Sequence, residues 1–139
     1  MSRQTRIKIV YNKMDEIANK MPGAVNEIVA ETLAEIDATV QLGMAAGGGG
    51  RVYIRRGRTH TASKPGEMPA RDLGALSGSL QVELQPSQYK GYYYTVSEYG
   101  MFLEYGTSKM APRPFMTPAA AKAKPGFMRK LKNLEKHLK

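Results

Sequence analysis

The sequence has 139 residues, of which 42% are hydrophobic and 24% are charged, which suits one domain with a modest core over residues 1–139. It contains no cysteine, which excludes disulfide scaffolds, thiolate metal sites and thiol nucleophiles. No apolar run reaches the length of a transmembrane helix, and the N-terminus lacks the apolar core of a signal peptide, so we expect no membrane partner.

Two helices are predicted at the N-terminal end. Apolar residues recur three or four positions apart from Thr5 to Leu42, which is the spacing of an amphipathic helix. Pro22-Gly23 interrupts this pattern, and proline removes a helical hydrogen bond and clashes with the preceding turn. We therefore predict a break or kink there, followed by a longer, acid-rich helix with Gly43 as its C-cap.

The next segment is predicted to contain a joint, a short strand and a long loop. Gly47 to Gly50 is expected to be a flexible joint. Residues 51–55 have the composition of a strand. From Gly57 to Gly78 the chain is rich in Gly, Pro, Ser and Thr, and a loop of that length is usually functional or disordered.

Two alternating segments predict an antiparallel hairpin. Leu80, Val82 and Leu84 alternate with polar residues, which is typical of a half-buried strand. Residues 86–88 are expected to form a turn, and residues 92–97 alternate again as the second strand.

The C-terminal part is predicted to be helical on either side of an extended segment. Residues 99–105 are expected to form a helical turn, with Phe102 and Leu103 facing inward. Met110 to Phe115 is expected to be extended, because a residue that precedes proline disfavours helix. A helix then begins with Thr117 as its N-cap, breaks at Pro125-Gly126 and continues as a strongly basic helix.

Together these elements predict an α+β fold. It consists of N-terminal helices kinked at Pro22-Gly23, a small antiparallel β-sheet with a long basic loop, and a C-terminal basic helix.

The net charge of +9 is concentrated in two places. Residues 105–139 contain nine Lys or Arg and one acid, and residues 51–64 contain five basic residues and no acid. Such clusters attract polyanions through counterion release, and they equally suit acidic protein neighbours or a solvated surface. A basic nucleic-acid-binding module is therefore one hypothesis for this chain, and a contact with duplex DNA is its expected consequence.

Residues that would indicate catalysis, a metal or a cofactor are sparse. The two histidines, His60 and His137, are far apart, and no pair of histidines has metal-ligand spacing on a helix. The glycine run lacks the Lys-Ser/Thr of a phosphate-binding loop. A triad of His60, Ser63 and Asp72 can be imagined, but loop neighbours rarely have triad geometry and nothing supplies an oxyanion hole. We expect no enzyme, no cofactor and no metal.

Tyrosines gather between residues 89 and 105, close in sequence to the basic clusters. Aromatic and basic residues together can stack the bases of single-stranded nucleic acid. Tyrosine on alternating strand positions also suits one face in a core and the other in a protein interface. We favour packing and an interface.

Two segments resemble a known family. The first is residues 60–80, HTASKPGEMPARDLGALSGSL, and the second is residues 99–119, YGMFLEYGTSKMAPRPFMTPA. Both are similar to the tail-completion, or minor-tail Z-like, family of lambdoid-type siphophages. Leu73 stands where that family usually has threonine, and Ser77-Gly78 stands where a basic residue is common. The second segment matches without a gap.

The resemblance implies a structural virion protein that joins the phage head to the tail tube in the virion neck. It implies assembly in the host cytoplasm and a homo-oligomeric ring, a hexamer or a dodecamer. The implied partners are connector or head-completion proteins and tail-tube or terminator proteins, with possible passing contact with genomic DNA. A terminator ring that caps the tail tube is the alternative.

Interface residues can be proposed from the basic cluster and from the second segment. Within that segment, a Glu104–Arg113 ion pair would fix the chain, either inside one subunit or between two. The expected interface residues are Arg51, Arg55, Arg56, Arg58, Tyr99, Phe102, Leu103, Glu104, Tyr105, Lys109, Arg113 and Phe115.

Overall fold

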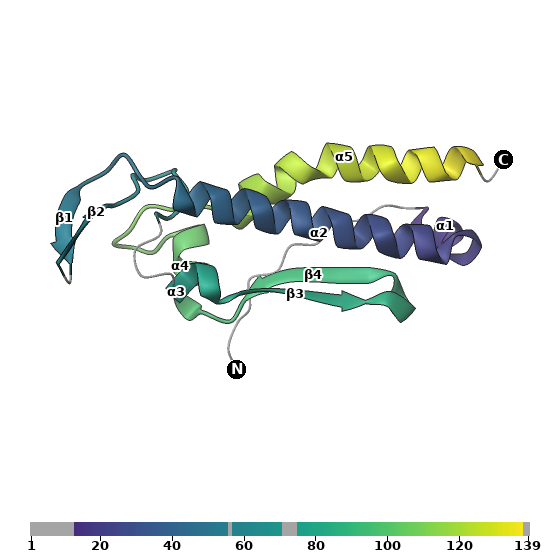
Figure 1. Cartoon of the computed structure of the whole chain (residues 1–139), viewed down its shortest axis with the longest axis horizontal. Helices are drawn as coiled ribbons and strands as arrows, with labels where there is room; N and C mark the ends of the chain where they lie inside the picture. The colour runs from purple at the N-terminus through teal and green to yellow at the C-terminus, as the bar shows by residue number, and fades with distance from the viewer. Residues whose placement is uncertain (1–12, 56, 71–74, 138–139) are drawn as a thin grey trace.

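The computed structural model describes residues 13–55, 57–70 and 75–137. The fold is α+β, and its main elements lie in three layers along one long axis (Figure 1). The long helix α2 (Pro22–Ala45) lies between the helix α5 (Met116–His137) and a ribbon of two antiparallel strands, β3 (Leu80–Gln85) and β4 (Lys90–Thr95). A second ribbon, β1 (Val52–Arg55) and β2 (Arg58–Thr61), projects from one end of α2 (Figure 1).

The predicted break at Pro22-Gly23 is confirmed. The short helix α1 (Met14–Lys20) ends before Met21, whose φ of −136° is not helical, and α2 begins at Pro22. Proline suits this first helical position because its missing N–H would have no partner there. The part of the predicted first helix that precedes residue 13 lies outside the described residues.

The central helix α2 carries a wide buried stripe because elements pack on both of its sides. Gly43 was expected to end this helix, and that prediction is wrong: α2 continues to Ala45, and Met44 is only 1% exposed. The apolar spacing of Val40 and Met44 extends the buried stripe by one more turn. The positive φ of +79° occurs later, at Gly47. The buried residues of α2 are Val25, Ile28, Val29, Thr32, Leu33, Ile36, Val40 and Met44.

The predicted hairpin is confirmed as β3 and β4, joined by the short 3-10 helix η1 (Pro86–Gln88). The second strand was predicted at residues 92–97 and lies two residues earlier, at Lys90–Thr95. Gly91 permits close packing on α2, because a Cβ there would lie 2.9 Å from Cγ1 of Val29. A single helix is narrower than the ribbon, and β4 packs on it more closely than β3 does. Val82 and Leu84 of β3 are therefore 45% and 47% exposed. They are more exposed than the prediction of a half-buried strand implies.

Tyr93 links the ribbon to α2 from the middle of the interface. Its ring is fully buried, and its hydroxyl donates a 3.0 Å hydrogen bond to Oδ1 of Asp37. Burial raises the pKa of the Tyr93 hydroxyl above its ordinary value, and the hydrogen bond to Asp37 raises it further. The hydroxyl is therefore held protonated as a donor to α2.

The prediction of a long loop from Gly57 to Gly78 is wrong in part, because this segment contains a strand and a helical turn. The strand β2 pairs with β1, with Val52 opposite Thr61 and Ile54 opposite Thr59. Gly57 takes a φ of +75°, and the β-branched residues beyond it favour a strand. The short helix α3 (Ala75–Gly78) ends the segment. Within the described residues, the strands thus pair as two separate ribbons.

The extended segment before α5 joins two helices whose boundaries differ in part from prediction. The helix α4 (Glu98–Tyr105) ends at Gly106, as expected. The helix α5 begins at Met116, so Thr117 lies inside its first turn instead of acting as N-cap. The break predicted at Pro125 is also wrong, because α5 runs through it. Proline has no N–H, so the carbonyl of Ala121, four residues before Pro125, has no hydrogen-bond donor within the helix. Both residues are exposed, so water can donate to that carbonyl.

Candidate assembly interface

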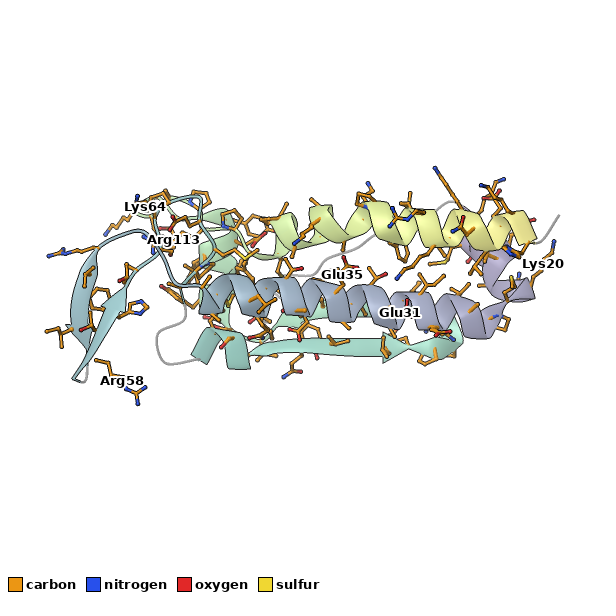
Figure 2. The ribbon with its side chains drawn as sticks, turned by 45° about the horizontal axis from the view of Figure 1, so that its top comes forward. Lys20, Glu31, Glu35, Arg58, Lys64 and Arg113 are labelled. Atoms are coloured by element: carbon orange, nitrogen blue, oxygen red, sulfur yellow. The ribbon has the colours of Figure 1, made fainter. Side chains whose placement is uncertain are left out.

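The two segments that carry the family resemblance meet beside one end of α2. The backbone N–H of Gly66 donates a 2.9 Å hydrogen bond to the carbonyl of Pro112. Nη1 of Arg113 donates a 3.2 Å hydrogen bond to Oγ of Ser63, which is 4% exposed. Figure 2 shows Arg113 and Lys64 close to the base of the β1–β2 ribbon. We call this region, residues 62–69 and 103–117, the motif junction.

Arg113 connects the motif junction but does not pair with Glu104. Its backbone N–H donates a 2.6 Å hydrogen bond to the carbonyl of Leu103, while its side chain reaches Ser63. Its Nε is buried and has no hydrogen-bond partner among the described residues. The predicted Glu104–Arg113 pair is therefore replaced by two separate contacts, because the Glu104 carboxylate is already occupied by the start of α5.

Glu104 caps the N-terminus of α5. Its Oε2 accepts hydrogen bonds from the backbone N–H groups of Phe115 and Met116 at 2.8 and 3.0 Å. Its Oε1 accepts hydrogen bonds from the backbone N–H and the hydroxyl of Thr117 at 2.8 and 2.5 Å. Glu104 is 4% exposed. Its carboxyl group provides buried acceptors for N–H groups at the start of α5 that have no partner within the helix. The motif junction is thereby fixed to α5.

Glu67 fixes the base of the projecting ribbon. Its Oε2 accepts hydrogen bonds from the backbone N–H groups of Gly49 and Lys64 at 3.0 and 2.8 Å. The bond from Gly49 and then the bond from Lys64 hold the pKa of the Glu67 carboxyl below its ordinary value. Sequence reasoning did not single out Glu67, although the Pro-Gly-Glu of the first segment is typical of a turn with an acceptor.

The glycine run, predicted as a flexible joint, packs closely on the chain beyond the ribbon. The backbone N–H of Gly50 donates a 2.8 Å hydrogen bond to the carbonyl of Ala62, and Ala62 donates one of 2.9 Å to Arg51. A Cβ on Gly50 would lie 2.7 Å from that carbonyl oxygen. The glycines thus allow a close approach of two backbones.

Residues 51–55 and 57–61 form a projecting arm. Val52 and Ile54 are 59% and 78% exposed, and Arg51 and Arg58 are also exposed. Figure 2 shows Arg58 near the free end of the arm. The side chain of Arg55 and all of Arg56 lie outside the described residues. The arm thus presents two of the predicted basic interface residues next to exposed apolar ones.

An aromatic stripe is exposed on α4. Tyr99, Phe102 and Tyr105, three positions apart, are 56%, 43% and 66% exposed. Phe102 was expected to face inward, and that prediction is wrong: Gly100 takes the inward position, where a Cβ would lie 2.7 Å from Cγ2 of Thr95. Lys109, beyond the helix, is exposed as well. Exposed aromatic residues of this kind are typical of protein interfaces.

Three of the predicted interface residues are buried inside the chain. Leu103, Glu104 and Phe115 are 2%, 4% and 0% exposed. They cannot form a docking surface in this conformation, because Leu103 and Phe115 belong to the hydrophobic core and Glu104 caps α5. Leu103 and Phe115 instead anchor this segment in the core, and Glu104 connects α4 to the start of α5.

The outer face of α5 is basic. Lys122, Arg129, Lys132 and Lys136 are all exposed, and their spacing places them on one side of the helix. On other sides, Lys130 forms a 2.9 Å ion pair with Glu31 of α2. Part of the basic charge that the sequence concentrates in residues 105–139 thus lies on one exposed face of α5.

The groups considered for a metal site and for a catalytic triad can be followed in the described part of the chain. No group of three or more His, Asp or Glu side chains there could hold a metal ion. The ring of His60 lies edge-on to Tyr53, with centroids 5.2 Å apart, and Ser63 contacts Arg113 instead. Asp72 lies outside the described residues. None of the described helices combines the length and apolar character needed to cross a membrane.

Comparison with protein-family models, with curated proteins and with solved structures found no match to this chain.

Proposed function

We propose that this protein is a structural, non-enzymatic component of a tailed-phage virion. In this proposal it joins the head to the tail tube in the neck as a homo-oligomeric ring, a hexamer or a dodecamer. Its neighbours would be a connector or head-completion protein on one side and a tail-tube or terminator protein on the other. The close alternative is a terminator ring that caps the tail tube.

The observation that carries this proposal is the convergence of the two family-like segments in one junction. Two exposed surfaces adjoin that junction, the arm and the aromatic stripe of α4. Both surfaces expose apolar side chains, which is typical of surfaces that a partner covers in an assembly. The partners named in the proposal come from the resemblance of the segments to the tail-completion family.

Phage particles made without this protein provide the test. Electron microscopy of a lysate from a phage with this gene deleted should show filled heads and separate tails of normal length. Supplying the gene in trans should restore joined, infectious particles. Tails of abnormal length would instead favour the terminator alternative. Normal, infectious particles in the absence of the protein would refute both.

The basic outer face of α5 favours a second candidate function, binding to nucleic acid. Four exposed cations could neutralise about four phosphates, which predicts a slope of roughly −3 to −4 in a plot of log affinity against log salt. Titration of purified protein with duplex DNA over a series of salt concentrations measures this slope. Replacing Lys122, Arg129, Lys132 and Lys136 by Gln should remove it. Absence of binding at low salt would exclude this function.

A further inference from the structure

The arm presents an apolar face that its own chain leaves uncovered. The strand register places Val52 opposite Thr61 and Ile54 opposite Thr59, so these four side chains share one face of the ribbon. Val52 and Ile54 are 59% and 78% exposed. Neither β1 nor β2 packs extensively on any other described helix or strand. A two-stranded ribbon is marginally stable by itself, so this face suits a surface on another molecule.

The arm is also strongly basic, which restricts the surfaces that it can contact. The segment from Arg51 to Lys64 contains five basic residues and no acid. The register places Arg58, which pairs with Arg55, on the opposite face of the ribbon from Val52 and Ile54. In a ribbon of two strands every residue lies at an edge, so a long Arg side chain can extend around the ribbon to the surface beneath it. The matching surface therefore combines exposed apolar or small side chains with carboxylates.

Such a surface exists on α2, between the layers formed by α5 and by β3–β4. Leu42 is 72% exposed, and the exposed residues that precede it on this side of the helix are small or acidic. Figure 2 shows Glu31 and Glu35 side by side on α2. Glu31 forms an ion pair with Lys130, whereas the carboxylates of Glu27 and Glu35 have no ion-pair partner within the described residues. We define the acidic stripe as Glu27, Glu31, Ala34, Glu35, Ala38 and Leu42.

We propose that the arm of one subunit docks on the acidic stripe of a second copy of this chain. The apolar face of the arm covers Ala38 and Leu42, and Arg51 and Arg58 reach Glu31 and Glu35 of that copy. The arm projects beyond the end of its own α2 (Figure 1), where it is placed to meet a neighbour.

Two different surfaces meet in this contact, so the association is head-to-tail. Repetition of such a contact closes into a ring when the rotation permits it. The docking therefore adds a subunit contact to the proposed function. Its assignment to a neck ring rests on that proposed function.

Disulfide trapping tests the contact directly, because the natural chain contains no cysteine. A variant with Ile54→Cys and Ala38→Cys would be oxidised as the full-length protein and run on a non-reducing gel. We expect a ladder of covalent dimers, trimers and larger species, since each subunit carries both halves of the contact. The matched control carries Ile54→Cys and Ser87→Cys, because Ser87 is exposed but lies at the far end of the β3–β4 ribbon. The control should cross-link at least about tenfold more slowly.

Charge reversal provides the second measurement. Glu31→Lys with Glu35→Lys should slow the cross-linking of the Ile54–Ala38 pair about tenfold, and adding Arg51→Glu with Arg58→Glu should restore it. A ladder that forms equally well with Ser87, or no ladder, overturns the docking. A monomer that binds duplex DNA through the arm overturns it as well. The particle experiment above does not depend on the arm, so failure of the proposed function would be seen separately.

Discussion

Glu104→Ala is expected to lower the free energy of unfolding by about 3 kcal/mol, which is a fall of about 10 °C in melting temperature for a chain of this size. The substitution removes the buried carboxylate that accepts four hydrogen bonds at the start of α5. Three backbone N–H groups and the Thr117 hydroxyl would lose their partner where little water can replace it. Thermal and urea unfolding followed by circular dichroism measure the loss.

The controls for this prediction separate the cap from the general loss of an acid. Glu98→Ala removes an exposed carboxylate from the same helix and should cost less than about 1 kcal/mol. Glu104→Gln keeps the size of the side chain, but its NH2 group would face N–H donors, so about 2 kcal/mol should still be lost. If Glu104→Ala has the same melting temperature as Glu98→Ala, the cap contributes little to stability.

The sequence was most informative where structure depends on neighbours in the chain. The spacing of apolar residues from Val25 to Val40 predicted the buried side of α2, and Pro22 predicted its beginning. The alternation in β3 and β4 predicted their pairing in the same way. These patterns report a local period of 3.6 or 2 residues, and the layers of the fold preserve both periods.

The predictions failed where a distant residue decides the outcome. Pro125 is compatible with a continuous α5 because its side of the helix faces solvent, which its sequence neighbours alone do not reveal. Thr117 is a residue type that favours the N-cap position. The carboxylate of Glu104, thirteen residues earlier, instead accepts the hydrogen bonds at the start of α5. The β1–β2 pairing was missed because one strand was hidden in a segment with the composition of a loop.

The candidate interface was predictable as a set of segments but not residue by residue. Resemblance pointed to both halves of the motif junction, which the structure brings together through Ser63 and Arg113. It could not separate the outward Tyr99, Phe102 and Tyr105 from the inward Leu103, since a helix of eight residues has too few turns to show its buried side by period. The acidic stripe of α2 was visible in sequence only as an acid-rich helix.

Gly48→Ala is expected to loosen the arm while leaving the helical body nearly unchanged. A Cβ on Gly48 would collide with the backbone of Ala62 and Ser63, which cannot move aside without separating the base of the arm. A local cost of about 2 kcal/mol corresponds to roughly thirtyfold faster amide exchange in the hydrogen bonds that join Gly50, Arg51 and Ala62. Hydrogen exchange with mass spectrometry of peptides from this region measures the change.

Gly49→Ala is the matched control, because it makes the same change at the next residue. A Cβ there would lie 3.2 Å from Oε1 of Glu67 and 3.4 Å from Cε of Lys64, which are ends of flexible side chains. Its exchange should therefore change much less than that of Gly48→Ala. Because the arm packs little on the body, the melting temperature of both variants should stay within about 3 °C of the natural protein. Equal exchange in the two variants would mean that the close backbone approach at Gly48 does not hold the arm. A large fall in melting temperature for Gly48→Ala alone would mean that the arm is coupled to the core, and the arm could then not be treated as an independent docking element.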